Sequence, residues 1–326
     1  SPIQIPLTVP FAPITNTSCA MSSRPYLLET NLDGKLPLVA KGKVRDIYQV
    51  NDSQLLFVAT DRISAYDVVM NNGIPDKGKL LTKLSEFWFD FFKDDIKNHL
   101  SHLDLEHGLS KDLLQPKYLQ QLEDRSLIVN KHKLIPLEVI VRGYLTGSAW
   151  SEYKKHGTIH GTKYPEGFQE SHEFEEPIFT PSTKAENGQH DENISIEQAI
   201  EIVGSEKIVN DLKTAAILLY SKAKEYAKTK NIIIADTKFE FGLDENDNLV
   251  LVDEVLTPDS SRFWNLSTYK LGQGQDSYDK QFLRNWLTEN NLRAKENVTI
   301  PEDIVEKTMA KYVEAYEGLT GKQPIN

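Results

Sequence analysis

Three charged side chains alternate along the segment IADTKFEFG (Ile234–Gly242). Asp236, Lys238 and Glu240 are spaced two residues apart, and aromatic residues lie between them. In a β-strand, residues at this spacing share one face and the aromatic residues share the other. An acid, a base and an acid on one face of a strand, after an apolar lead-in, indicate a polar site on a sheet.

The next apolar segment supplies a further acid. Polar residues at 244–248 separate the two apolar runs, which is typical of a hairpin. If its loop is Glu245–Asn248, Asp253 lies directly across from Glu240. Two facing carboxylates repel each other unless a cation lies between them. Lys238 can balance part of this negative charge. Mg²⁺ would balance it better than Lys238, because Mg²⁺ prefers oxygen ligands. Spacing alone leaves open the alternative of a solvated face on an edge hairpin.

An arginine interrupts a second strand-like segment, PLEVIVRGYLTGSAW (Pro136–Trp150). Arg142 precedes a glycine- and serine-containing stretch that includes Gly147 and Ser148. A guanidinium next to free backbone N–H groups is a good clamp for an anion. The alternative is that Arg142 pairs with Glu138 or with a surface carboxylate.

Two other segments carry groups that suit anions. In AKGKVRDIY (Ala40–Tyr48), Gly42 allows close approach of the backbone to a phosphate, and we expect Lys43 and Arg45 to share one strand face. The segment is neither a P-loop nor a dinucleotide fingerprint, so an exposed basic strand is the alternative. The segment TPDSSRFW adds Asp259, Ser260 and Arg262 as a further anion contact.

The stretch Lys154–Asn193 is rich in glycine, proline and charge, and we expect a long loop, functional or disordered. It contains Lys184, His190 and Asp191. His190 lacks a second ligand at the spacing of a zinc site. Since the chain has no GxSxG and Cys19 is its single cysteine, covalent hydrolase chemistry is poorly supported.

Composition narrows the function classes. The 326 residues include 37 basic and 48 acidic ones, and the net charge of −11 argues against a nucleic-acid partner. No apolar run approaches the roughly 20 residues of a membrane span, and one cysteine fits a reducing, cytoplasmic location. The first twenty residues lack charge and the features of targeting signals, so we expect residues 1–24 to form a mobile extension, with a natural start at Met21.

The order of patterns predicts an α+β protein. Hairpin strands are expected at VRDIYQV and LLFVAT, and a helix at LLTKLSEFWFDFFKDDI. Ser195 and Gln198 form a capping box that begins a helix ending at Gly204. Further helices are expected at about 207–230, 278–290 and 301–317, and strands at 127–141 and 231–255. We expect a mainly antiparallel front lobe (25–136) and a larger mixed lobe with C-terminal helices (137–326).

Together these segments resemble the signatures of the SAICAR synthetase (phosphoribosylaminoimidazole-succinocarboxamide synthase) family of purine biosynthesis. The resemblance rests on LIPLEVIVRGYLTGS and IADTKFEFG, with GKVRDIY before them and DEVLTPDSSRFW after them. It covers about 36–264, and the C-terminal helices are similar to the fungal form. It implies an ATP- and Mg²⁺-dependent ligase that joins L-aspartate to a carboxyaminoimidazole ribonucleotide through an acyl phosphate, with a front lobe like that of protein kinases.

The resemblance also assigns roles to individual residues. It implies that Lys184 lies near the transferred phosphoryl group and that Asp191 is the base for the incoming amine. Metal binding falls to Asp253 and Glu240. The ATP site would contain Gly42, Lys43, Arg45, Glu138, Lys238 and Glu240. The ribotide site would contain Arg142, Gly147, Ser148, Asp259, Ser260 and Arg262.

Two rival functions use similar residues. A small-molecule kinase of related fold would also need ATP, Mg²⁺ and basic clamps, but it would not require aspartate. A noncatalytic nucleotide-binding regulator would have lost a site residue, whereas Lys184, Lys238, Glu240 and Asp253 are all present. The sequence leaves the oligomeric state open, with a monomer as the preferred expectation, and it does not identify the side chains that hold aspartate.

Overall fold

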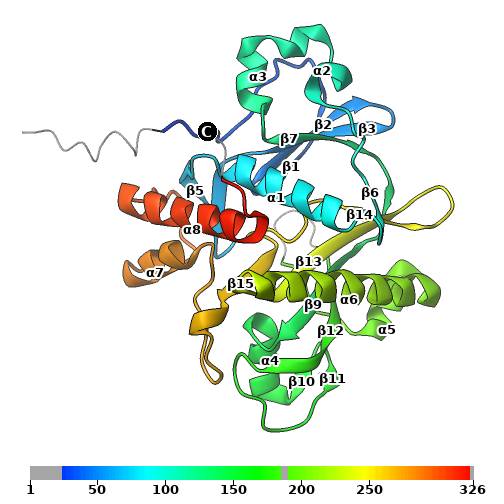
Figure 1. Ribbon diagram of the computed structural model, residues 1–326, viewed down its shortest axis with the longest axis vertical. Coiled ribbons are helices and arrows are strands. Elements are labelled where there is room, and N and C mark those ends of the chain that lie inside the picture. Colours follow the sequence, from blue (N-terminus) through cyan, green and yellow to red (C-terminus); the bar gives the residue numbers. More distant parts are fainter. Residues whose placement is uncertain (1–23, 185–189, 324–326) are drawn as a thin grey trace, which may run out of the picture.

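A long central strand organises the larger sheet. The computed structural model describes residues 24–184 and 190–323 (Figure 1). Within them, β13 (Ile232–Leu243) pairs with four strands: β8 (Lys133–Leu134), β9 (Leu137–Tyr144), β14 (Leu249–Val252) and β15 (Ser261–Asn265). The sheet continues through β12 (Glu173–Thr183) beside β9 and through β6 (Lys97–Asn98) beside β14. The pair β14–β6 is parallel and the other pairs are antiparallel.

A second sheet forms the front of the molecule. Its antiparallel order is β1 (Leu38–Lys41), β2 (Arg45–Asn51), β3 (Gln54–Ala59) and β7 (Ser126–Asn130). Its own small core includes Leu56 and Val58 from β3 together with Leu113 and Leu122. The last two come from η2 (Lys111–Leu114) and α3 (Pro116–Leu122), which follow α2 (Leu105–Gly108).

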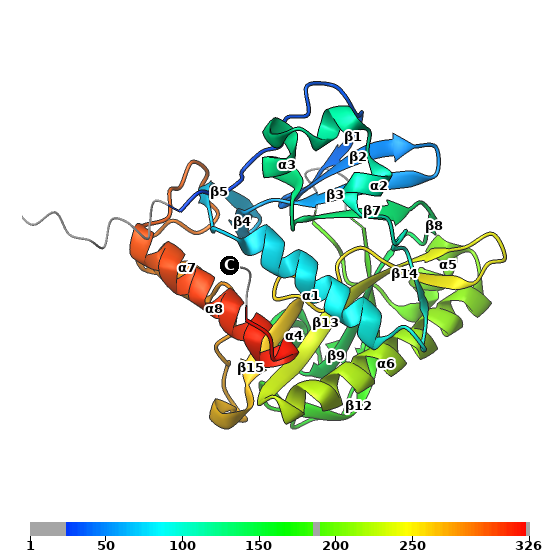
Figure 2. The same ribbon diagram turned by 45° about the horizontal axis from the view of Figure 1, so that its top comes forward.

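The helices connect the two sheets. Helix α1 (Lys77–Phe91) lies between them, alongside α8 (Glu302–Thr320), as Figures 1 and 2 show. Helix α7 (Gln281–Glu289) packs on α8, and α6 (Glu206–Thr229) covers one face of the larger sheet. The remaining elements are β4 (Arg62–Ala65), β5 (Val68–Gly73), α4 (Gly147–His156), β10 (Thr158–Ile159), β11 (Thr162–Lys163), α5 (Ile196–Val203) and η3 (Leu266–Thr268). The expected α+β class, with C-terminal helices, is confirmed.

A bulge explains the face alternation of β13. Ile232 and Ile234 pack in the main core, and so do Phe239 and Phe241. The first pair has even numbers and the second has odd numbers, so in a regular strand the two pairs would lie on opposite faces. The register against β15 shifts between Ile234 and Asp236, and such a bulge exchanges the faces of the strand. Ile232 and Ile234 of the apolar lead-in therefore face the same core as the two phenylalanines, while the charged residues face away from it.

The expectation of a long loop over Lys154–Asn193 is wrong for much of that segment. The segment includes the end of α4, the β10–β11 hairpin and the eleven-residue strand β12, which pairs with β9. β12 contains two prolines and three exposed glutamates near its start, so it lacks the alternation of a typical strand. The capping box of Ser195 and Gln198 is confirmed, with Gly204 in the left-handed conformation at the end of α5.

The termini of the described chain lie at its surface. The expected extension, residues 1–24, falls outside the described residues except for Arg24, whose guanidinium lies 2.5 Å from Asp76. No helix in the described ranges combines the length and the apolar character needed to cross a membrane.

Helix α6 approaches the sheet closely at Gly143. A Cβ at this position would lie 1.9 Å from the hydroxyl oxygen of Tyr220. That hydroxyl is fully buried and donates a hydrogen bond of 2.5 Å to the carbonyl of Ile234. Strands β9 and β13 and helix α6 are thus fixed together at one point, without a side chain on the glycine to separate them.

We predict that Gly143→Ala lowers the free energy of unfolding by about 2 kcal/mol, because the methyl group overpacks this contact. Tyr220→Phe should cost about 1 kcal/mol through the lost hydrogen bond. The double variant should cost less than the sum, since the atom that the methyl meets first is gone. Urea denaturation measures all three variants.

Gly274→Ala is the matched control, because a Cβ there would lie 3.8 Å from the carboxylate of Glu170, which is an ordinary van der Waals distance. Its free energy of unfolding should change by less than about 0.5 kcal/mol. Strictly additive costs in the double variant would contradict the proposed contact.

Candidate active site

A polar cleft of about 300 Å³ opens over the charged face of the larger sheet. Its walls come from β9, β13 and β15, from the start of α4 and from the approach to α7. Most of the predicted ribotide residues line it, as do two of the residues expected near ATP and aspartate. Those predicted residues are Arg142, Ser148, Asp191, Lys238, Asp259, Ser260 and Arg262.

The centre of the cleft is a carboxylate held between two arginines. Asp236 on β13 is the register partner of Arg142 on β9 and of Arg262 on β15, so the three side chains cross adjacent strands in one row. The Asp236 Oδ2 atom lies 2.6 Å from Arg262 Nη1 and 3.7 Å from Arg142 Nη1. Asp236, which we expect from the sequence to be structural, therefore positions both predicted anion-binding arginines.

Arg142 is buried, with 3% of its side chain exposed. Its Nε donates to Thr180 Oγ1 at 3.1 Å, and its Nη2 lies 3.4 Å from Ser148 Oγ. Burial lowers the pKa of Arg142 to about 10, and the charge of Asp236 opposes that shift. The ion pair of Arg142 is with Asp236, so the alternative pairing with Glu138 is not the one that forms.

The glycine- and serine-rich stretch after β9 begins helix α4; it is not a turn. Gly147 has φ +61°, and a Cβ there would lie 2.5 Å from Arg262 Nη2. Gly147 therefore provides the space that the Arg262 guanidinium occupies. Ser148, in the first turn of α4, accepts a hydrogen bond of 2.9 Å from Asn193 Nδ2, which brings the segment after residue 190 to the cleft.

Asp259 lines the cleft, but both of its carboxylate oxygens already have partners. Lys77 Nζ lies 2.6 Å from Asp259 Oδ2, and the Tyr312 hydroxyl donates to Asp259 Oδ1 at 2.5 Å. Lys77 is fully buried, and 6% of the Asp259 side chain is exposed. The interactions tie the turn of Thr257–Ser261 to α1 and α8, so Asp259 holds Ser260 in place at the cleft.

Two further cationic side chains line the cleft, and the sequence motifs did not predict them. Lys280 and Arg284 lie four residues apart at the start of α7, and both border the cleft. Residues four apart share one face of a helix, so the spacing within DKQFLR was a usable signal. The sequence alone does not single out this pair of cations, because the segment also fits an ordinary amphipathic helix.

A cluster of acids lies farther along β13. Glu138, Glu240 and Asp253 lie close enough together for the negative charges of Asp253 and Glu138 to act on Glu240. The expected register is wrong by one residue, because Glu240 pairs with Val252 and the hairpin loop has five residues, 244–248. Asp253 still reaches Glu240, since β14 ends at Val252 and Asp253 has φ +67°, which turns the chain.

The cluster leaves negative charge poorly compensated. Burial, followed by the charges of Asp253 and Glu138, raises the pKa of Glu240 to about 10. Burial would also raise the pKa of Asp253, but the charge of Arg45 and the hydrogen bonds of Asp253 lower it. The Oε2 atom of Glu138 is buried and has no hydrogen-bond partner among the described residues. Hard carboxylate oxygens in such a group fit a divalent cation such as Mg²⁺.

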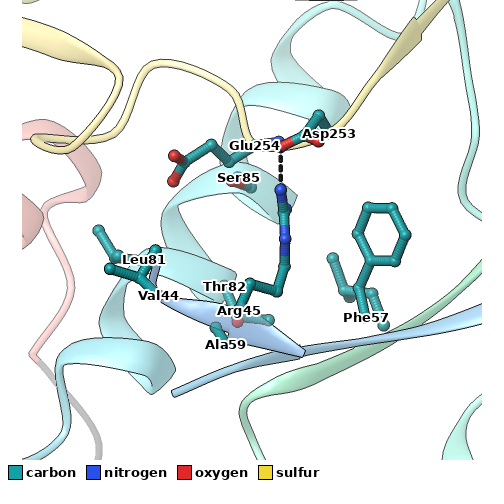
Figure 3. Close-up of a pocket in the computed structure, with 10 residues that line it drawn as sticks. Val44, Arg45, Phe57, Ala59, Leu81, Thr82, Ser85, Asp253 and Glu254 are labelled. Atoms are coloured by element: carbon teal, nitrogen blue, oxygen red, sulfur yellow. Dashed lines mark hydrogen bonds and ion pairs between the residues drawn. The ribbon is translucent and has the colours of Figure 1, made fainter. Parts of the chain in front are cut away.

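The front sheet contributes Arg45 to this cluster. Figure 3 shows its side chain rising from β2 to an ion pair with Asp253, beside the ring of Phe57. Lys43 does not share that face: it lies in the turn before β2, and its Nζ is 2.9 Å from the exposed Asp67. The expectation of a common strand face is therefore wrong. The backbone of the turn is held by Arg62, which donates to the carbonyl of Gly42 at 3.0 Å.

Three predicted side chains lie between the cleft and the acid cluster. Lys184 Nζ lies 3.6 Å from Glu240 Oε1. Lys238 Nζ lies 3.4 Å from Asp191 Oδ2, and both side chains are partly exposed. Glu138 belongs to the acid cluster and is the neighbour of Ser182 on β12. The residues that the sequence analysis attached to ATP and to phosphoryl transfer are thus neighbours, apart from Gly42 and Lys43.

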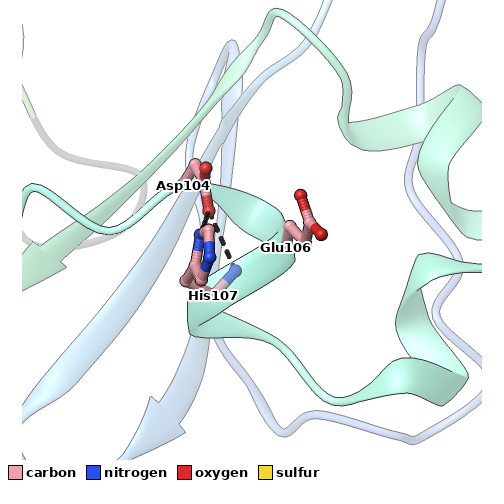
Figure 4. Close-up of side chains that lie close together, drawn as sticks. All are labelled: Asp104, Glu106 and His107. Atoms are coloured by element: carbon pink, nitrogen blue, oxygen red, sulfur yellow. Dashed lines mark hydrogen bonds and ion pairs between the residues drawn. The ribbon is translucent and has the colours of Figure 1, made fainter.

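A separate group of side chains that could bind a metal lies at helix α2, beside the front sheet. Within the described residues, Asp104, Glu106 and His107 are close enough to share an ion (Figure 4). Asp104 is the N-cap of α2: its Oδ1 accepts from the His107 backbone N–H at 2.9 Å and lies 2.6 Å from His107 Nδ1. Capping accounts for the arrangement, and all three residues are exposed.

Comparison with known proteins agrees with this geometry. The model of the family SAICAR synthetase matches residues 38–301. A phosphoribosylaminoimidazole-succinocarboxamide synthase from Saccharomyces cerevisiae is 65% identical over 304 residues, which span 91% of this chain and 98% of that protein.

Two solved structures are also similar. The SAICAR synthase from Saccharomyces cerevisiae complexed with SAICAR has a TM-score of 0.87 and 62% identity, covering 91% of this chain and 99% of that one. A type-2 SAICAR synthetase in complex with ADP has a TM-score of 0.64 and 26% identity, covering 88% and 99%. With the family model matching most of its length, the chain belongs to the SAICAR synthetase family.

Proposed function

We propose that this protein is an ATP-dependent ligase that joins L-aspartate to the carboxylate of 5-amino-1-(5-phospho-D-ribosyl)imidazole-4-carboxylate, giving SAICAR, ADP and phosphate. The observation that carries the proposal is the row Arg142–Asp236–Arg262, which lies in a cleft next to a buried acid cluster. One solved relative is complexed with SAICAR and another is in complex with ADP, which agrees with one site for a ribotide and one for a nucleotide.

The arginine row suits the phosphate of the ribotide. Asp236 neutralises part of the charge and fixes the two guanidinium groups, so little side-chain freedom is lost on binding. Ser148 and Ser260 add hydroxyl groups at the cleft wall. Lys280 and Arg284 supply further positive charge in a cleft that must receive a phosphate and the two carboxylates of aspartate.

The nucleotide is proposed to lie between the front sheet (in residues 25–136) and the larger lobe. Lys184 and Lys238 would contact its phosphates, and the Gly42 turn would cover them. Glu240 and Asp253 would hold Mg²⁺, whose charge would neutralise the acids and the phosphates when bound. Arg45 is already paired with Asp253, so it is placed to balance charge at the same point.

The reaction explains why such a site is needed. A carboxylate does not acylate an amine at neutral pH, because hydroxide is a poor leaving group. Transfer of a phosphoryl group to the ribotide carboxylate forms an acyl phosphate, which the amine of aspartate attacks with release of phosphate. Lys184 would stabilise the transferred group, and Asp191 would accept a proton from the amine. Water must be excluded to protect the acyl phosphate.

Omission of single substrates tests the proposal against a small-molecule kinase. With ATP, Mg²⁺ and the ribotide present, steady-state phosphate release should require L-aspartate, and SAICAR should form in equal amount. ATP turnover that continues without aspartate and yields a phosphorylated ribotide with no free phosphate would instead identify a kinase. Phosphate release and product mass measure both outcomes.

We predict that Arg142→Ala raises the KM for the ribotide and lowers kcat/KM by about 2–3 kcal/mol, because charge-assisted hydrogen bonds to the phosphate are lost. The KM for ATP should change little. Lys207→Ala, which removes an exposed cation on α6, is the control of equal charge. A loss of ATP affinity with ribotide affinity unchanged would show that Arg142 is misassigned.

We predict that Asp253→Asn sharply lowers turnover and raises the Mg²⁺ concentration needed for the half-maximal rate at saturating ATP, since the cation loses an anionic ligand. The variant also breaks the ion pair with Arg45. Arg45→Met is therefore the matched control, because it breaks the same pair and retains the carboxylate. Equal Mg²⁺ requirements in the two variants would argue against a metal ligand at Asp253.

A further inference from the structure

His160 occupies a backbone conformation that histidine seldom adopts. Strands β10 and β11 pair through Thr158 with Lys163 and Ile159 with Thr162, so their turn is His160–Gly161. Both turn residues have positive φ, +47° and +81°. This is the geometry of a type I′ turn, for which asparagine followed by glycine is preferred. His160 therefore lacks the side chain that this turn prefers.

Both ring nitrogens of His160 have partners, and they define the state of the ring. The side chain is buried, with Nδ1 2.9 Å from the carbonyl oxygen of Pro181 and Nε2 3.1 Å from Arg142 Nη2. A carbonyl only accepts and a guanidinium only donates. Nδ1 must therefore carry the proton, while Nε2 offers its lone pair to Arg142. Burial, followed by the charge of Arg142, lowers the pKa of His160 to about 4, which agrees with a neutral ring.

We infer that His160 is a positioning residue whose Nε2 orients the guanidinium of Arg142 toward the cleft; this rests on the proposed role of Arg142 in binding the ribotide phosphate. Thr180 accepts from Nε of Arg142 and Asp236 faces Nη1, so two of the three guanidinium nitrogens have partners. At the third nitrogen, Nη2, His160 lies at 3.1 Å and Ser148 at 3.4 Å. His160 thus provides the shorter contact to Nη2.

A single carboxylate holds the turn in place behind the arginine. Glu152 on α4 accepts from the backbone N–H groups of His160 and Gly161, each at 3.1 Å, and from the Thr158 hydroxyl at 2.6 Å. Ser148 lies at the cleft in the first turn of α4, so the same helix anchors both acceptors of Arg142 Nη2. The strained turn therefore has a fixed relation to the anion clamp.

His160→Asn preserves the turn but removes the contact with Arg142. Asparagine favours the left-handed conformation, and its amide reaches the position of Nδ1 but not that of Nε2. We expect the KM for the ribotide to rise about tenfold, the change produced by losing one hydrogen bond to a charged group. The kcat and the KM values for ATP and aspartate should change less than about twofold. His160→Gln, which reaches the Nε2 position, should recover part of the affinity.

His156→Asn is the matched control, because this exposed histidine ends the same helix. A ribotide KM unchanged in His160→Asn, or a fall in kcat with KM unchanged, would overturn the inference. Arg142→Ala is measured in parallel. If that variant leaves the ribotide KM unchanged, the proposed clamp fails; if it raises KM and His160→Asn does not, only the role of His160 fails.

The tautomer gives a test in the unaltered protein. Nitrogen-15 spectra of histidine-labelled, full-length protein should show a neutral ring protonated at Nδ1 for His160 at pH 7, assigned by its absence from the His160→Gln spectrum. A ring protonated at Nε2, or at both nitrogens, could not accept from Arg142 and would overturn the inference. This result does not depend on any property of the proposed reaction.

Discussion

The site depends on the buried carboxylate of Asp236. Two guanidinium groups face it from neighbouring strands, and the register of β9, β13 and β15 brings all three into one row. A charge taken out of water is costly unless it is paired and hydrogen-bonded, so each member of the row needs the others. The sheet geometry that satisfies Asp236 is also the geometry that presents two cations to the cleft.

Along β13 the sign of the local charge reverses within a few residues. The Asp236 end carries the arginines, and the Glu240 end carries an acid cluster whose charge is only partly balanced by Lys184 and Arg45. Lys238 lies between the two ends. A strand with period-two alternation can therefore place an anion site and a cation site side by side, which suits a reaction that brings a nucleotide phosphate to a carboxylate.

Short-range patterns were sufficient for much of this fold. The β2–β3 and β13–β14 hairpins, helix α1 and the cap of α5 all follow from neighbours in sequence. Motif residues Arg142, Arg262, Glu240 and Asp253 do come together in two adjoining groups. The wrong predictions concern features that depend on distant partners or on single residues. Strand β12 forms because β9 offers it an edge to pair with. One extra loop residue shifts the register between β13 and β14.

Side-chain roles were harder to predict than positions. Asp259 was expected to contact substrate, yet its partner Lys77 lies 182 positions away in the chain. His160 carried no motif, and its importance depends on a turn, a carbonyl and an arginine from three different segments. Contacts of this kind follow from the tertiary structure, because no local spacing in the sequence encodes them.

The contact between Gly143 and Tyr220 extends the functional unit of this protein into its core. Gly143 is the residue after Arg142 on β9, so the backbone that carries the arginine on one face is held against α6 on the other. A change in α6 that displaces the strand would move the arginine with it. Variation deep in the core, remote from any bound molecule, would then alter substrate affinity, and α6 and the cleft would be constrained to evolve together.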